Sequence, residues 1–221
     1  MSNKSKKEGT MDKFLDAAEA RERLLYELSV MTGFKYLKSG MLKKNLKDLV
    51  FEVDFQSSHW NLSGQSIEIC AVFRLAYKKF GKLPPNTYNI VASKGYHPEG
   101  GYWYEITTES KLNETKNILA QLLKETAVDL ADRFEKNYEE AMNYLFYDAF
   151  DKYKVYLDFV ADYFGQDFIK EKAQKIYDEL SDDEKDMIVQ YKNGTLTKKA
   201  FLLNRCNLKY IVDNDLYEVK Y

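Results

Sequence analysis

The chain has 221 residues, 45% of them hydrophobic, so it has ample material for one large core. Its formal net charge of −2 argues against a general nucleic-acid binder. Two cysteines are too few for a disulfide framework, and the longest apolar runs, such as Ile69–Phe73, are too short to cross a membrane. We therefore expect a cytoplasmic protein with no membrane segment.

The first fifty residues predict a disordered lead-in, a helix and a hairpin. Residues 1–10 are polar and lack the apolar stretch of a signal peptide. Residues 11–31 carry apolar side chains at helical spacing, and Gly33 is placed to end this helix in a left-handed conformation. Residues 34–46 predict a hairpin that turns at Ser39-Gly40. Lysines crowd this region, which favours protection of a sheet edge from aggregation over contact with an anionic partner. They are Lys35, Lys38, Lys43, Lys44 and Lys47.

The stretch from residue 49 to residue 76 organises the rest of the chain. Residues 49–56 and 67–75 alternate between apolar and polar side chains, which is typical of two strands with one buried face. The opposite face carries charged residues. They are Glu52, Asp54, Glu68 and Arg74. These charges either pair across strands on a solvated face or form the polar floor of a binding cleft.

Two motifs in this region resemble a known family. GFKYLKSG at residues 33–40 is followed by a short strand, by VDFQSSHWN at residues 53–61 and by an alternating apolar strand. This pattern resembles the bacterial family called domain of unknown function 4304, over roughly residues 20–145. The matching positions are Gly33, Phe34, Lys35, Gly40, Phe55, Gln56, Ser58, Trp60, Asn61 and Trp103. The resemblance implies an α+β domain and no established chemistry.

The middle of the chain predicts a long loop, a strand and helical structure. Residues 80–101 contain all three prolines and four of the ten glycines, which indicates an irregular segment. Residues 102–106 are rich in aromatic side chains and predict a strand. Residues 113–146 have helical spacing and form either one helix or two, with a weak point at Thr126–Val128.

The C-terminal part predicts further helices and a terminal strand. Helices are expected over residues 147–164 and 167–180. The Ser181 and Glu184 spacing is a capping box for a helix through Lys192. Thr197–Cys206 predicts a short helix, and the tail alternates as a strand or a hairpin around Asp213-Asn214 would.

These elements predict an α+β fold. We expect an antiparallel sheet of about four or five strands, packed on one face against helices, with a helical C-terminal extension. The chain would then divide into a disordered N-terminus at residues 1–10, an α+β domain at 11–146 and the extension at 147–221.

The sequence predicts no catalytic constellation, cofactor or metal site. Its two histidines, His59 and His97, fall in separate loops, and neighbouring serines on a strand end point to the opposite face. Cys70 sits within a strand and is expected to be a packed residue, and Cys206 has no base partner in sequence. The carboxylates at residues 182–186 are explained by a helix first turn.

Trp60 is the strongest candidate binding residue. It lies in a polar loop between two strands, where it either packs back over the sheet edge or anchors a partner. The predicted binding residues are Gln56, Ser58, His59, Trp60, Asn61, Arg74, Tyr96 and Trp103. The many aromatic residues of the helical part either line the seam between helices and sheet or form an exposed interface.

These observations favour a binding or inhibitor protein that acts by protein–protein interaction, such as a toxin-immunity protein or a conflict protein of a mobile element. The alternative is an enzyme that handles a small molecule or nucleotide on the polar sheet face, with Glu52, Asp54 and Arg74 as its charged floor. Nucleic-acid binding through the lysine-rich hairpin is opposed by the total charge.

Overall fold

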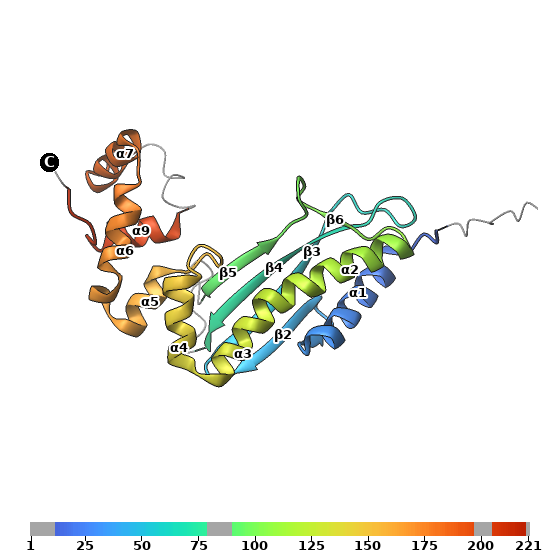
Figure 1. Ribbon diagram of the computed structural model, residues 1–221. Helices are drawn as coiled ribbons and strands as arrows, with labels where there is room; N and C mark the ends of the chain where they lie inside the picture. Colours follow the sequence, from blue (N-terminus) through green and yellow to red (C-terminus); the bar gives the residue numbers. More distant parts are fainter. Residues whose placement is uncertain (1–11, 79–89, 197–204, 220–221) are drawn as a thin grey trace, which may run out of the picture.

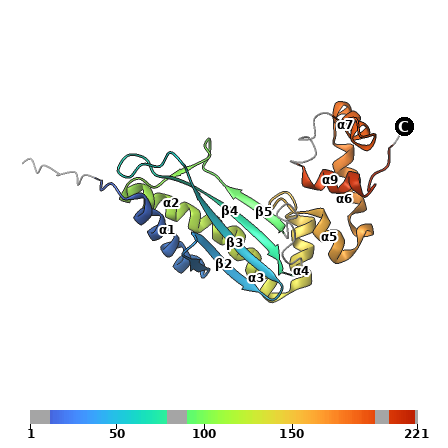
Figure 2. The ribbon, with the colours of Figure 1, turned by 180° about the vertical axis from the view of Figure 1, so that it is seen from behind.

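An antiparallel sheet covered by helices on one face forms the N-terminal part of the molecule, and further helices gather at one end of it (Figures 1 and 2). The computed structural model describes residues 12–78, 90–196 and 205–219. Its strands are β1 (Lys35–Leu37), β2 (Met41–Leu46), β3 (Leu49–Ser57), β4 (Glu68–Tyr77), β5 (Ile90–Tyr96) and β6 (Tyr104–Glu105). The sheet runs β1-β2-β3-β4-β5, and β6 pairs with β4 beside the end of β5. The predicted α+β class is confirmed.

The alternation of β3 and β4 sets the two faces of the sheet. Phe51 and Phe73 point toward the helices, where their rings lie 6.1 Å apart and both side chains are fully buried. One cross-strand row on the opposite face joins Lys43, Glu52, Arg74 and Ser93 through the register of four strands. A shift of one residue would exchange these two faces, so the apolar pattern determines the register.

Two helical segments, lying side by side, cover the apolar face (Figure 1). Helix α1 (Ala17–Thr32) begins where the Asp16 carboxylate accepts hydrogen bonds from two backbone amides, which places its start later than the expected residue 11. It ends at Gly33, whose φ of 71° confirms the predicted left-handed cap. Helices α2 (Glu109–Leu123) and α3 (Asp129–Lys136) are joined by a π-helical segment, Lys124–Val128, at the expected weak point.

Shorter helices form the C-terminal part. They are α4 (Tyr138–Asn143), which continues into a π-helical turn at Tyr144–Asp148, α5 (Leu157–Phe164), α6 (Gln166–Asp178), α7 (Asp182–Lys192) and α9 (Cys206–Asp213). The predicted capping box of Ser181 and Glu184 is present at the start of α7. One buried apolar cluster includes residues from Leu15 to Leu216, so the core crosses the boundary expected near residues 147–150.

Three expected elements are wrong. Strand β5 lies within the expected irregular segment at residues 80–101. Residues 149–156 are turns and a bridge to β5 rather than the start of a helix, because Tyr153 and Val155 alternate inward beside the sheet. The expected C-terminal strand is helix α9, which buries Leu208, Ile211 and Val212 at helical spacing.

Other expectations lie outside the described residues. They concern residues 1–10, most of the expected short helix at Thr197–Cys206, and residues 79–89 of the long loop. No helix of the described residues is long and apolar enough to cross a membrane.

Candidate functional site

The loop between β3 and β4 is built by its own polar side chains. The Asn61 amide donates to the carbonyl oxygen of Glu68 at 2.9 Å, and the Asn61 side-chain oxygen accepts from the Glu68 amide at 2.8 Å. Ser58 donates its backbone amide to the same Glu68 carbonyl, and its hydroxyl accepts from the Trp60 amide at 3.3 Å. Asn61 thus pairs with β4 as a neighbouring strand would, and it fixes the shape of the loop.

The far side of this loop is fastened to the start of α1. The Ser63 hydroxyl accepts from the Ala17 amide at 3.0 Å and donates to the Asp16 carboxylate at 2.9 Å. The Gly64 amide donates to the carbonyl oxygen of Leu15 at 3.2 Å. Hydrogen bonding by the Ser63 hydroxyl is the main cause that lowers the pKa of Asp16. The loop is therefore held at both ends by the fold.

The apolar side chains of this region point into solvent. Trp60 is 75% exposed, and its ring lies 4.4 Å from that of His59. Leu62 in the same loop and Phe14 before α1 are also exposed. Of the two expected placements of Trp60, packing over the sheet edge is wrong. We call these four residues, Phe14, His59, Trp60 and Leu62, the Trp60 surface.

A second aromatic group lies where β5 leads into β6. The rings of His97 and Tyr102 are stacked at 4.4 Å, and Trp103 meets Tyr102 edge-on at 5.0 Å. His97 also hydrogen-bonds through Nδ1 with the carbonyl oxygen of Tyr102 at 3.1 Å. Gly95 allows this arrangement, since a Cβ there would lie 2.7 Å from Nε2 of His97. These contacts hold the segment that carries Trp103 against β5.

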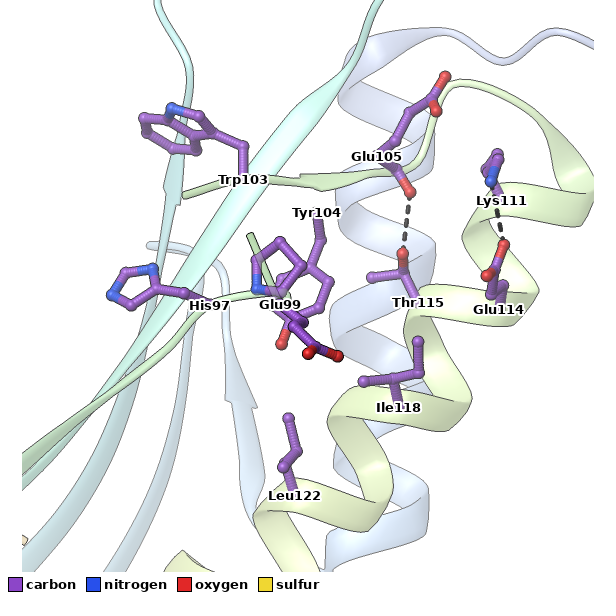
Figure 3. Close-up of a pocket in the computed structure, with 11 residues that line it drawn as sticks. His97, Glu99, Trp103, Tyr104, Glu105, Lys111, Glu114, Thr115, Ile118 and Leu122 are labelled. Atoms are coloured by element: carbon purple, nitrogen blue, oxygen red, sulfur yellow. Dashed lines mark hydrogen bonds and ion pairs between the residues drawn. The ribbon is translucent and has the colours of Figure 1, made fainter. Parts of the chain in front are cut away.

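A groove separates this segment from helix α2 (Figure 3). Its volume is about 390 Å³. Trp103, Tyr104, Ile118 and Leu122 contribute its apolar lining. Charged side chains complete the lining. They are Glu99, Glu105, Glu114 and Lys111. The groove thus combines aromatic and aliphatic contact surface with mostly acidic groups at its rim.

Most charges on the polar face of the sheet are paired. Lys43 pairs with Glu52 at 2.9 Å, and Arg74 pairs with Asp54 at 3.6 Å. The expected pairing across strands is therefore found for Glu52, Asp54 and Arg74, whereas Glu68 has no ion-pair partner among the described residues. On the same face, the fully buried thiol of Cys70 lies 3.8 Å from the Gln56 amide oxygen.

Cys70 is not placed for nucleophilic chemistry. Burial is the main cause that raises the pKa of its thiol, and the charge of Asp54 raises it further. A thiolate is therefore disfavoured at this position. No group of three or more histidine, cysteine, aspartate or glutamate side chains that could hold a metal ion occurs in the part of the chain that the structure describes.

The structure brings together only some of the predicted binding residues. Gln56, Ser58, His59, Trp60 and Asn61 lie at the end of β3 and in the loop that follows it, although Ser58 and Asn61 shape the loop rather than face solvent. The others lie elsewhere: Arg74 is ion-paired in the middle of β4, Trp103 borders the groove, and Tyr96 is in the core.

Tyr96 is a correction to the predicted site. Only 2% of it is exposed, and its hydroxyl lies against the Thr126 hydroxyl in the π-helical segment. Sequence reasoning also missed four residues of this end of the molecule: Phe14, Leu62, Tyr102 and Glu105. Leu62 could have been predicted, because it is an apolar residue inside a polar loop. The positions of the other three depend on contacts between segments that are far apart in the sequence.

Comparisons with models of known protein families, with curated proteins and with solved structures found no match to this chain. The resemblance over roughly residues 20–145 therefore rests on its motif residues alone.

Proposed function

We propose that this protein binds another protein through the Trp60 surface. The observation that carries the proposal is an indole that is 75% exposed on a loop fixed by hydrogen bonds at both ends. Tryptophan buries a large area at low entropic cost, and it is enriched among the residues that dominate protein interfaces. A rigid loop adds to this, because little conformational freedom remains to be lost on binding.

The neighbouring residues support a contact surface larger than one side chain. Phe14 and Leu62 are exposed beside the same loop, and the stacked ring of His59 extends the aromatic area. Contiguous patches of exposed apolar side chains often mark sites of protein interaction. A binding protein of the immunity or inhibitor class, which acts by occupying its target inside the cell, is the function that this surface supports best.

The polar sheet face gives less support to the enzymatic alternative. Arg74 and Asp54 form one ion pair, and Lys43 and Glu52 form another. A charged substrate would have to compete with these partners, so the face is suited to stabilising the sheet.

The test is the Trp60→Ala variant of the full chain. We expect its free energy of unfolding to stay within about 0.5 kcal/mol of wild type, because an exposed side chain is removed. The partner that tagged wild-type protein captures from the producing cells should bind the variant at least about thirtyfold more weakly.

Tyr26→Ala is the matched control, since Tyr26 is 60% exposed on α1 and is not part of the Trp60 surface. This variant should keep the partner. The proposal is overturned if Trp60→Ala binds that partner as well as Tyr26→Ala does, or if it destabilises the protein by about 3 kcal/mol or more.

A further inference from the structure

Two glutamates face each other across the strands beside the Trp60 surface. Glu68 of β4 and Glu105 of β6 are directly opposite in the antiparallel register. Neither carboxylate has an ion-pair partner among residues 12–78, 90–196 and 205–219. Like charges directly opposite each other destabilise a sheet. Asn61 binds the backbone of Glu68, so the pair is adjacent to the loop that carries Trp60.

The acidic character continues from this pair into the groove. Glu105 borders the groove through its backbone, whose carbonyl oxygen accepts from the Thr115 hydroxyl, while its carboxylate points away from Ile118 and Leu122 (Figure 3). Glu99 and Glu114 also line the groove. Lys111 is the only lysine or arginine among the described residues that line the groove, and it forms an ion pair with Glu114 at 3.2 Å. Glu99, Glu114 and the outward-pointing Glu105 thus outnumber the one ammonium group, which the charge of Glu105 also attracts, and the potential around the groove favours a cation.

The apolar part of the groove fits the stem of a long basic side chain. Lysine and arginine have apolar stems that pack along hydrophobic surface while the charged head reaches polar groups. Ile118 and Leu122 offer such a surface, whereas the indole of Trp103 points away from both of them. Figure 3 shows Ile118 and Leu122 on α2 along one side of the groove and Glu99 opposite them.

We infer that the partner presents a basic segment, with lysine or arginine side chains placed in the groove and an apolar residue against Trp60. The inference rests on the proposed function and names the chemistry of its partner. Charge complementarity favours a basic segment, because an acidic segment or a nucleic-acid phosphate would meet Glu68, Glu99 and Glu105 with like charge. Binding would also relieve the repulsion between Glu68 and Glu105.

The two tryptophans provide the readout, since Trp60 and Trp103 are the only ones in the sequence and they lie on the two parts of this surface. The probe is a synthetic peptide of alternating arginine and leucine, and a peptide of alternating glutamate and leucine is its control. We expect the indole N–H resonances of both tryptophans to shift saturably with the basic peptide only. Added salt should weaken this binding.

Neutral variants separate the groove from general electrostatics. Glu68→Gln and Glu105→Gln should each weaken the basic peptide by about tenfold and leave the fold intact, because the change removes a repulsion. Glu171→Gln is the matched control, because Glu171 is exposed on α6 in the C-terminal part and should leave affinity unchanged.

Equal response to both peptides, absence of a saturable shift, or equal losses in Glu105→Gln and Glu171→Gln would overturn the inference. The proposed function fails separately. A captured partner that is lost by Trp60→Ala but retained by Glu68→Gln and Glu105→Gln would leave the Trp60 surface in place and refute the basic segment alone.

Discussion

Arg21 is the polar residue within the apolar stripe of α1, and its guanidinium has a defined place against the sheet. Its Nη2 donates to the carbonyl oxygen of Phe55 at 2.9 Å. The guanidinium also lies against Gly40 in the β1–β2 turn, where a Cβ would overlap it. One side chain thus joins the first helix to the turn and to the end of β3, and Gly40 leaves the space that it needs.

We expect Gly40→Ala to lower the free energy of unfolding by about 2–4 kcal/mol. The cause is a backbone φ of 88° combined with the steric overlap on Arg21. Gly33→Ala is the control, because Gly33 has a φ of 71° but open space around its Cβ position. Only the backbone penalty of about 1–2 kcal/mol applies there. Urea unfolding of both variants measures the difference. Equal losses of unfolding free energy would mean that the Arg21 side chain moves away from the added methyl group at no energetic cost.

At the residue scale, the sequence predicted the polar loop but not the hydrogen bonds of each side chain. The VDFQSSHWN motif left Trp60 either packed over the sheet edge or free to anchor a partner, and Trp60 is exposed. Ser58 and Asn61 looked like binding groups because they are polar, yet their hydrogen bonds go to the backbone of the loop and of β4. Glu68 and Glu105 lie opposite each other because of the register between β4 and β6. Strand β6 has only two residues, too few for its register to be predicted from the sequence.

At the scale of elements, the π-helical segment Lys124–Val128 joins α2 and α3 over the sheet. Such a segment changes the backbone hydrogen-bond pattern, and buried hydroxyl groups donate to carbonyl oxygens around Thr126. Tyr153 donates to the Thr126 carbonyl oxygen at 3.1 Å, and the Thr126 hydroxyl donates to the carbonyl oxygen of Leu122. The segment therefore ties α2 and α3 to the chain at residue 153 and to Tyr96 on β5.

We expect Tyr153→Phe to lower the free energy of unfolding by about 1–3 kcal/mol, because it leaves the buried Thr126 carbonyl without this donor. Tyr138→Phe is the matched control: its hydroxyl has no hydrogen-bond partner among the described residues, and its removal should change stability by less than about 0.5 kcal/mol. Chemical denaturation of the two variants gives the comparison. A Tyr153→Phe protein as stable as Tyr138→Phe would show that the π-helical segment does not need the Tyr153 hydroxyl.

Elements whose apolar residues recur at a regular spacing were predictable from the sequence. Elements whose conformation depends on tertiary contacts were not. The alternation of residues 49–56 and 67–75 gave β3 and β4 with the correct faces. Strand β5 was missed because Gly95 and the nearby prolines weaken its local signal, whereas its pairing with β4 stabilises it. Residues 206–213 carry apolar side chains that fit either period, and packing of Leu208 and Ile211 into the core decides for a helix.

At the scale of the whole molecule, the C-terminal helices are joined to the sheet by its edge. Val155 bridges to Ala92, and the Tyr156 amide donates to the Val91 carbonyl oxygen at 2.9 Å. Asn207 of α9 then donates to the Val155 carbonyl oxygen at 2.7 Å and accepts from the Leu157 amide at 2.9 Å. Helix α9 thus holds the segment that borders β5, while the loop between β3 and β4, with the exposed Trp60, lies at the opposite end of the sheet (Figure 2).

A chain that ends at Phe146 is therefore expected to lose cooperative thermal unfolding. It lacks Tyr153 and Val155, which are fully buried, and it uncovers the edge of β5. A chain that ends at Leu180 keeps this segment and should melt cooperatively at a lower temperature, because it loses α7, α9, the Asn207 contacts and the buried side chains of Ile211 and Leu216. Calorimetry of both fragments beside the full chain decides the matter. A cooperative transition in the shorter fragment would place the domain boundary near residues 147–150, as the sequence predicts, and would show that the sheet holds its own edge without Val155.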